Sequence, residues 1–175
     1  MGVSTYEIDI YHSDLNFTIR HLMVNRVRGW FTHWLGVVLL DELDVTRSSV
    51  EVAIDATSVA TGFPLRDAEL RSPMFLDTVR HPELSFRSTR VDASGDGRID
   101  VTGDLRIRGM THEVRVDTEI GHHVVDAFGT ERVAYSGRAA FGCADFSIQV
   151  GLEVEAIKRT APRLVRAGSL GLQVL

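Results

Sequence analysis

Residues 11–23, YHSDLNFTIRHLM, contain two histidines, a serine and an aspartate. Such side chains can bind a metal ion or form a nucleophilic catalytic site. However, apolar and polar residues alternate from Leu15 to Ile19, which indicates a β-strand with one apolar face. On a regular strand His12 and His21 would point to opposite faces and lie about 30 Å apart, at roughly 3.3 Å per residue. Because metal–ligand bonds are only about 2 Å long, we interpret the stretch as a strand and not as a metal or catalytic cluster.

The remaining candidate ligands and nucleophiles form no recognisable motif. None of the seven histidines has HxH, HxxxH or HExxH spacing, and the adjacent His122 and His123 would diverge on a strand. The single cysteine, Cys143, has no CxxC partner and cannot form an internal disulfide. No GxSxG nucleophile motif is present. We therefore predict no metal, no cofactor and no catalytic residue.

Polar residues at two places near the N-terminus each allow two interpretations. Asp9, His12 and Ser13 form either a small polar cluster or a set of caps for the start of a strand, and we favour the caps. His21 falls on the apolar face of the same strand. It is either a core histidine with satisfied hydrogen bonds or, if the interior is a cavity, a polar contact for the head group of a ligand.

The composition is that of one ordinary domain. A chain of 175 residues can bury roughly 70% of its unfolded surface, so it needs no disulfide. The net charge of −5 and the lack of a basic block argue against a nucleic-acid-binding protein. No run approaches the roughly 18 apolar residues of a membrane span, and MGVSTYEIDI lacks the features of a signal peptide. We expect a cytoplasmic protein, or a periplasmic or secreted one if a leader has been removed.

Period-two alternation recurs along the chain and predicts about eight strands. After the first strand they are expected at 27–41, 48–55, 82–91, 98–107, 112–120, 131–141 and 147–157. The apolar parity changes near Thr32, which predicts a bulge or kink there. Turn residues at 93–97 and 108–110 predict hairpins. Hairpin spacing without crossover helices indicates an all-β antiparallel sheet, closed into a barrel or stacked as a sandwich.

Residues 64–78, between the third and fourth strands, have a helical character instead. Ser72 followed by Pro73 is typical of an N-cap and first helical turn, so we predict two short helical turns here. The barrel domain is expected to span 1–158. The tail, 159–175, is weakly patterned and is either flexible or packs a short strand, with its apolar residues Leu170, Leu172 and Val174.

Five short motifs occur in order between residue 6 and about residue 120. They are HSxLxFxIxH at 12–21, GxF followed by a glycine at Gly29, Phe31 and Gly36, RDxxLRSxxF at 66–75, PxLxFxST at 82–89 and GDLxIxGxTxxV at 103–114. Together they resemble the YceI-like family of lipocalin-like, polyisoprenoid-binding barrels. The resemblance weakens after that, because Ala144 and Ser147 stand where the family carries arginine and glycine, and a glycine-rich hairpin is missing. This departure leaves open how the seventh and eighth strands pair.

The resemblance implies an eight-stranded antiparallel lipocalin-like barrel, with a short helical insert between strands 3 and 4, that is often a homodimer. It also implies a bound long-chain isoprenoid or similar amphiphile. Burying about twenty carbons would contribute on the order of 16 kcal/mol before binding costs, at roughly 0.8 kcal/mol per CH₂. Small inward residues would leave room for the ligand: Ser88, Gly103, Gly137 and Ala139.

Strand parity and the resemblance together give a set of candidate ligand contacts. The predicted wall residues are Phe17, Ile19, Phe31, Val38, Val52, Ile54, Phe75, Phe86, Leu105 and Phe141. We predict Arg66, Arg71 and His21 as contacts for a polar or pyrophosphate head group. Ordinary surface charge is the alternative for the two arginines.

Binding, storage or transport of the lipid is the predicted function, and two alternatives stay open. An enzyme acting on an isoprenoid or quinone intermediate in the same pocket would need a buried pair of groups with shifted pKa values, and no such pair is evident. A filled barrel that serves as an interaction module would have no cavity.

Overall fold

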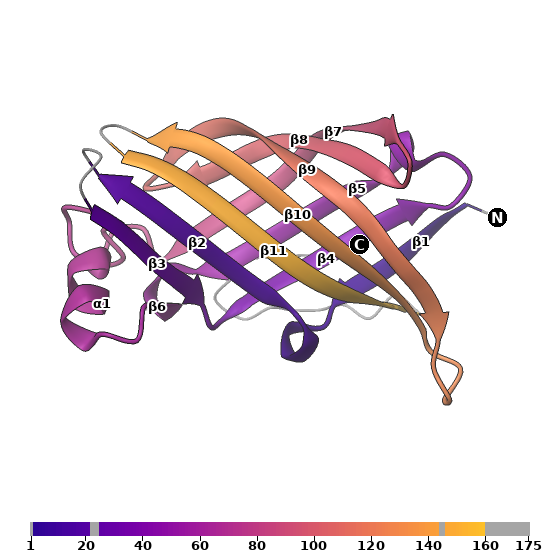
Figure 1. Ribbon diagram of the computed structural model, residues 1–175, viewed down its shortest axis with the longest axis horizontal. Helices are drawn as coiled ribbons and strands as arrows, with labels where there is room; N and C mark the ends of the chain where they lie inside the picture. The colour runs from indigo at the N-terminus through magenta and orange to yellow at the C-terminus, as the bar shows by residue number, and fades with distance from the viewer. Residues whose placement is uncertain (1, 22–24, 144–145, 160–175) are drawn as a thin grey trace.

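The computed structural model describes residues 2–21, 25–143 and 146–159 (Figure 1). The strands are β1 (Val3–Ile8), β2 (Asp14–His21), β3 (Asn25–Phe31), β4 (Trp34–Asp41), β5 (Ser49–Asp55), β6 (Val59–Ala60), β7 (Glu83–Gly95), β8 (Arg98–Ile107), β9 (Met110–Val125), β10 (Glu131–Cys143) and β11 (Phe146–Lys158). The helices are α1 (Pro64–Arg71) and the 3-10 helices η1 (Ile10–His12), η2 (Val45–Arg47) and η3 (Ala56–Ser58). In these ranges no helix has the length and apolarity to cross a bilayer.

The strands close into an antiparallel barrel. Around the ring the order is β1, β4, β5, β7, β8, β9, β10 and β11, and β11 pairs again with β1. β2 extends β1 past η1, and β3 extends β4, so each of these pairs acts as one long bent strand. Figure 1 shows the tilted strands wrapped around one interior. The predicted eight-stranded antiparallel barrel, with a helical insert between the third and fourth strands, is confirmed.

The N-terminal strand β1 was not predicted from the sequence. Only Tyr6 among its residues is fully buried, so the segment shows little of the alternation by which the longer strands are found. Its backbone nevertheless pairs on both sides, with β4 and with β11. β1 is therefore the strand that closes the ring.

The polar residues between β1 and β2 act as caps, as predicted. A carboxylate oxygen of Asp9 accepts a hydrogen bond from the Tyr11 N–H at 3.1 Å, and its other oxygen lies 2.9 Å from Nδ1 of His12. The hydroxyl of Ser13 accepts from the Glu155 N–H at 3.0 Å, which joins this turn to β11. Two of these contacts satisfy backbone N–H groups, those of Tyr11 and Glu155, and the third joins the Asp9 and His12 side chains within the turn between the two strands.

The predicted kink near Thr32 is confirmed as the break between β3 and β4. There the chain turns toward η3: the Thr32 N–H donates to the Ser58 carbonyl at 3.2 Å, and the His33 N–H donates to the Ser58 hydroxyl at 3.1 Å. The change of direction brings Trp34 into the core, where its side chain is buried. The change in apolar parity along this stretch is therefore a real bend.

The insert forms one helix and not two helical turns. Pro64 occupies the first turn of α1, where its missing N–H costs nothing. Ser72 ends the helix, since its N–H donates back to the Glu69 carbonyl at 3.0 Å. The predicted turn does begin at Ser72, whose carbonyl accepts from the Phe75 N–H at 3.0 Å, but it does not form a second helix. Turns follow instead. Leu70 packs with Phe17 and Val59, and in this way α1 is fastened to one end of the barrel (Figure 1).

The hairpins and the last strands complete the barrel. Asp96–Gly97 and Arg108–Gly109 are two-residue turns in which every φ is positive, between 52° and 75°, as primed hairpin turns require. β10 and β11 pair continuously from Arg132 to Cys143. The seventh and eighth strands therefore pair along their whole length despite the departure from the family motif. Residues 160–175, which include most of the predicted tail, lie outside the described residues.

An apolar cavity inside the barrel

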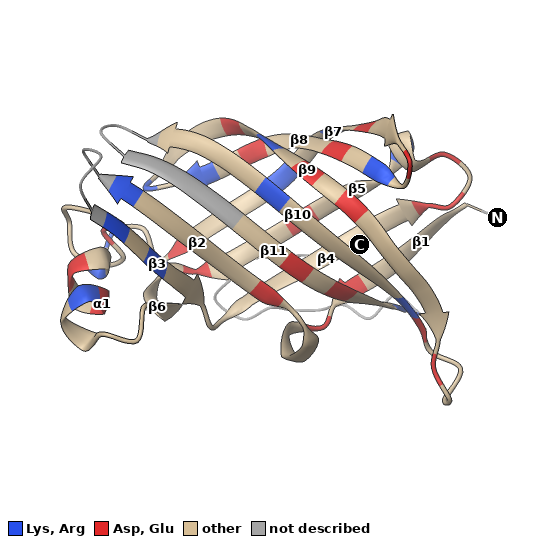
Figure 2. Cartoon of the chain, in the orientation of Figure 1, with Lys and Arg blue, Asp and Glu red and all other residues tan. Residues whose placement is uncertain are grey.

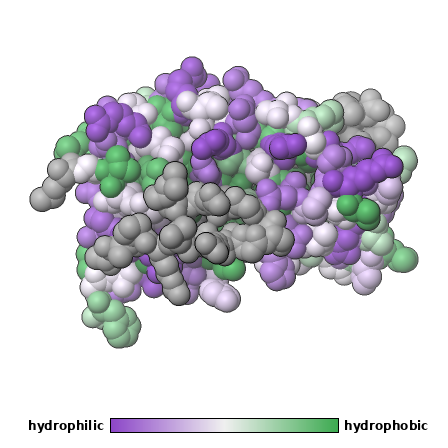
Figure 3. Space-filling model, turned by 180° about the vertical axis from the view of Figure 1, so that it is seen from behind, coloured by the Kyte–Doolittle hydropathy of each residue, from purple (hydrophilic) through white to green (hydrophobic). Residues whose placement is uncertain are grey.

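The barrel interior contains a cavity of about 210 Å³. Its described lining residues come from every strand of the ring and from α1, which places the cavity along the barrel interior. Apolar side chains make almost the whole wall, and no Lys, Arg, His, Asp or Glu belongs to it among the described residues. Figure 2 shows Lys, Arg, Asp and Glu distributed along the strands and at the ends of the barrel. Seen from behind, the described surface is mainly hydrophilic, with separate hydrophobic patches (Figure 3).

The structure brings most of the predicted wall together. The predicted residues that line the cavity are Phe17, Ile19, Phe31, Val38, Val52, Ile54, Phe86, Leu105 and Phe141. Phe75 does not line it and packs instead against the buried cluster of Phe17, Val59 and Leu70. Period-two parity found the inward positions because every barrel strand has one apolar face. Contact of these residues with a ligand stays a prediction.

The predicted head-group residues are not part of the cavity wall. Arg66 lies over the ring of Phe63, with 4.9 Å from its guanidinium carbon to the ring centroid. Arg71 donates from Nε to the Thr57 carbonyl and from Nη2 to the Val59 carbonyl, both at 2.8 Å. Its guanidinium therefore fastens α1 to the η3–β6 segment. His21 ends β2, and its side chain lies outside the described part of the structure.

The inward glycines do not leave the space that was predicted. A Cβ on Gly103 would lie 2.6 Å from Cζ of Phe86, because that ring lies over the glycine. A Cβ on Gly137 would lie 3.0 Å from side-chain carbons of Val116 and Leu152. The glycines thus make room for neighbouring side chains of the protein itself. The prediction that Gly103 and Gly137 open the cavity is wrong.

The other two small residues of the predicted set, Ala139 and Ser88, differ in whether they line the cavity. Ala139 lines the cavity. Ser88 does not, and its hydroxyl accepts a hydrogen bond from the Val50 N–H at 2.9 Å. That bond lies next to an irregularity in the β7–β8 register between Ser88 and Arg90. Ala139 is therefore the small residue of the predicted set that borders the empty space.

A few polar residues interrupt the apolar wall: Asn16, Ser48, Ser49, Thr118 and Tyr135. The Ser48 hydroxyl accepts from the Asp41 N–H at 3.0 Å, and the Thr118 hydroxyl donates to the Val116 carbonyl at 3.3 Å. The Tyr135 hydroxyl is buried and has no hydrogen-bond partner in the described part of the chain. Burial raises the pKa of Tyr135 far above its usual value, so the phenol is neutral and keeps its proton.

Sequence reasoning missed Tyr135 as a site residue, although it shares the inward parity of Val133 and Phe141. Parity alone would have placed its ring inside the barrel. Whether its hydroxyl finds a partner depends on residues of other strands, and no local pattern reports that.

The described wall of the cavity offers apolar surface for binding, and Tyr135 is the titratable residue among its described members. General acid–base or nucleophilic catalysis needs a titratable pair at the reacting atoms. The described wall supplies a single neutral phenol. Across residues 2–21, 25–143 and 146–159 no group of three His, Cys, Asp or Glu side chains is placed to hold a metal ion.

Known proteins resemble this chain in sequence and in fold. Residues 6–162 match the family described as the YceI-like domain. Protein YceI of Escherichia coli O157:H7 is 34% identical over 149 residues, which is 84% of this chain and 78% of that protein. Burkholderia cenocepacia BcnA superposes with a TM-score of 0.73 at 17% identity, covering 85% of this chain and 98% of BcnA. A polyisoprenoid-binding domain from Saccharophagus degradans superposes with a TM-score of 0.63 at 16% identity, covering 90% and 98%.

The two solved structures share the fold, and the family match covers most of the chain, from the middle of β1 to beyond the end of β11. The barrel fold, the α1 insert and the sequence motifs are all consistent with this match. This chain belongs to the YceI-like family.

Proposed function

We propose that this protein binds an isoprenoid-type lipid, or a similar long amphiphile, inside the barrel and serves as its carrier or store. The observation that carries the proposal is the apolar cavity, whose described wall holds no charged side chain. Such a wall favours hydrocarbon, because burial contributes roughly 0.8 kcal/mol per CH₂. The Saccharophagus degradans domain of the same fold, described as polyisoprenoid-binding, supports the choice of ligand class.

The size of the cavity limits what fits without rearrangement. An apolar cavity of about 150 Å³ holds benzene, whereas pockets for drug-sized ligands measure about 300–1,000 Å³. At about 210 Å³ the cavity lies between these values. A short prenyl segment fits it as it stands, and a longer chain requires inner side chains such as Phe86 and Leu152 to change rotamer. We therefore expect the bound protein to have a wider interior than the structure described here.

A charged head group is excluded from the interior on energetic grounds. Burying an unpaired phosphate in an apolar cavity costs far more than the several kcal/mol that binding can spare. A pyrophosphate would have to stay outside, beside α1, where Arg66 is exposed. Contacts of Arg66, Arg71 or His21 with a head group stay predictions.

The experiment that tests the proposal is mass spectrometry of an organic extract of the purified, folded protein. A prenyl lipid in about one-to-one ratio to protein would support the carrier and identify the ligand. The ligand-free protein should also take up an added C20 prenyl hydrocarbon, followed through the fluorescence of Trp34, whose buried ring lines the cavity. No extracted lipid together with no uptake would overturn the proposal.

Neither alternative function has an observation in its favour. An enzyme would need titratable groups in the wall, and the described wall has only the neutral Tyr135. A filled interaction module would lack the cavity.

A further inference from the structure

Two described tyrosines, Tyr6 and Tyr135, have a buried hydroxyl without a hydrogen-bond partner, and of these two only Tyr135 lines the cavity. The residue is 9% exposed, lines the cavity, and packs in the core with Trp34 and Val154. No described residue forms a hydrogen bond with its hydroxyl oxygen. Buried polar groups in proteins are almost always hydrogen-bonded, so an exception in a binding cavity calls for a functional explanation.

The backbone next to Tyr135 is also irregular. The β9–β10 register shifts between Val133 and Tyr135, where His123 pairs with Val133 but Ile120 pairs with Tyr135. β9 therefore carries an extra residue opposite Ala134, which is a β-bulge. Bulges re-aim side chains and are frequent beside binding sites. Here both Val133 and Tyr135 are buried on the inner face of the barrel.

We propose that the Tyr135 hydroxyl is a binding subsite that donates a hydrogen bond to a neutral acceptor oxygen of the ligand, most simply the carbonyl of a ketone, quinone or amide. This rests on the proposed function and narrows it to lipids that carry such a group. A phenol held neutral donates one hydrogen bond and cannot balance a negative charge. The described wall also supplies no cation, so the acceptor must itself be neutral.

The subsite also accounts for selectivity among lipids of the same length. Against a pure hydrocarbon, the carbonyl ligand gains the Tyr135 hydrogen bond, while the hydrocarbon leaves the hydroxyl unpaired. A site built around a hydrogen-bonding group discriminates in this way against analogues that lack it. The expected preference is roughly 3- to 10-fold in Kd, the value of one net hydrogen bond.

The test compares two C20 prenyl probes, a hydrocarbon and a ketone, bound to the full chain, Tyr135→Phe and Tyr6→Phe. Trp34 fluorescence gives Kd, and the infrared stretching band of the ketone reports its hydrogen bond directly. Tyr6→Phe is the matched control, because it also removes a buried hydroxyl without a hydrogen-bond partner, but from a residue that does not line the cavity. The wild type and Tyr6→Phe should prefer the ketone and lower its carbonyl frequency, whereas Tyr135→Phe should bind both probes equally and leave the frequency unshifted.

The outcomes separate the two proposals. If Tyr135→Phe keeps the ketone preference and the shifted band, the subsite is overturned while lipid binding stands. If neither probe binds the wild type, both the proposed function and the subsite fail. Folding of the variant is checked by its unfolding temperature. Since the substitution removes an unpaired buried hydroxyl, the ligand-free Tyr135→Phe protein should unfold about 2–4 °C higher than the wild type.

Discussion

Phe17 on β2 lies across from Gly29 on β3, and its ring occupies the space that a side chain at position 29 would need. A Cβ on Gly29 would lie 2.5 Å from Cζ of Phe17 and 2.6 Å from the carbonyl oxygen of Ala60. The contact with Gly29 fixes the position of Phe17. The Phe17 side chain packs with Val59 and Leu70 next to α1. The centroid of its ring lies 5.3 Å from that of Phe31.

Gly29→Ala should therefore destabilise the barrel. One of the two clashes is with backbone, which cannot move aside cheaply, and overpacking of this kind costs typically about 1–3 kcal/mol. The measurement is the free energy of unfolding in urea. Gly2→Ala is the control, because nothing lies within 4 Å of a Cβ there. Equal stability of the two variants would show that Phe17 does not hold this position.

Arg71→Ala should lower stability by about 1–3 kcal/mol, because it leaves the Thr57 and Val59 carbonyls without their charged donor. Arg71→Lys should not restore the loss, since a single ammonium cannot reproduce two bonds from one planar guanidinium. Arg66→Ala removes only an exposed contact with Phe63 and should cost less than about 1 kcal/mol. Urea unfolding of the three variants checks these values. If Arg71→Ala were as stable as the wild type but bound lipid more weakly, Arg71 would be the head-group contact that the sequence suggested.

Much of the fold could be predicted from the sequence because strand alternation and two-residue turns are local signals. The kink at Thr32 is also local, since the apolar parity changes at that point. β1 was missed because few of its residues are buried. Ser72 was taken as the start of a helical turn because Ser–Pro has the same local sequence whether a helix begins or ends there.

The site was harder to predict than the fold because its free volume depends on contacts between strands. Gly103 looks like open space in the sequence, but the register of β7 and β8 brings the Phe86 ring over it. Arg71 looks like a free surface charge, but the turn after β5 brings two carbonyls to its guanidinium. The sequence thus shows which side chains point into the barrel, but it does not show which of them fill the interior.

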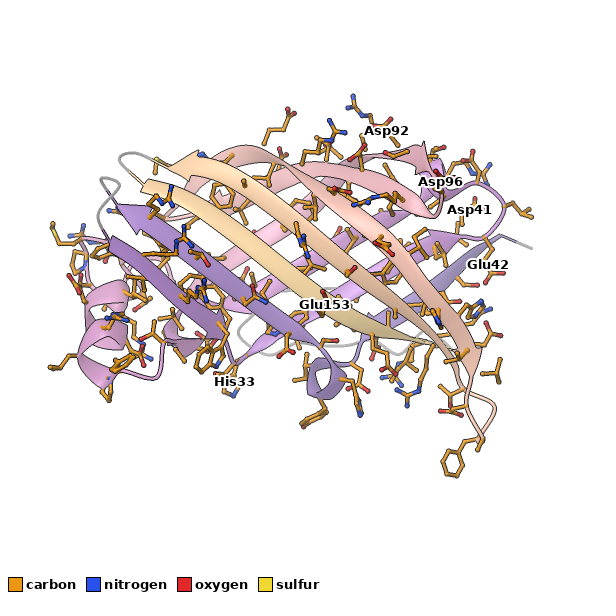
Figure 4. The ribbon with its side chains drawn as sticks, viewed as in Figure 1. His33, Asp41, Glu42, Asp92, Asp96 and Glu153 are labelled. Carbon is orange, nitrogen blue, oxygen red and sulfur yellow. The ribbon has the colours of Figure 1, made fainter. Side chains whose placement is uncertain are left out.

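Acid should destabilise the barrel at the end where β4 finishes, where Figure 4 shows Asp41 and Glu42. The buried Asp41 carboxylate accepts from Arg47 Nε at 2.7 Å and from the Leu43 N–H at 3.0 Å. The hydrogen bond from Arg47 is the main reason why the pKa of Asp41 lies below its usual range. A carboxyl group whose pKa is lower in the folded than in the unfolded protein stabilises the fold at pH values above its unfolded pKa of about 3.9. This stabilisation is lost as the pH falls through the folded pKa.

The measurement for Asp41 is the unfolding temperature as a function of pH. The wild type should lose stability as pH falls below about 4. Asp41→Asn should be less stable at pH 7 and should depend less on pH in the acid range, because the titrating group is gone. Arg47→Met should also be less stable at pH 7, since it leaves the buried carboxylate without its cation. Parallel pH profiles for the wild type and Asp41→Asn would contradict the role given to this carboxylate.

Filling the cavity from Ala139 should weaken lipid binding without unfolding the protein. Ala139 lines the cavity, whereas Ala140, the next residue of β10, is exposed. Ala139→Leu adds three carbons to the interior and displaces a similar length of ligand, worth roughly 2 kcal/mol or about thirtyfold in Kd. Ala140→Leu adds the same atoms on the outer face and should bind the C20 prenyl hydrocarbon like the wild type. If both variants bound it with unchanged affinity, the lipid would lie outside the barrel, and the cavity would not be its site.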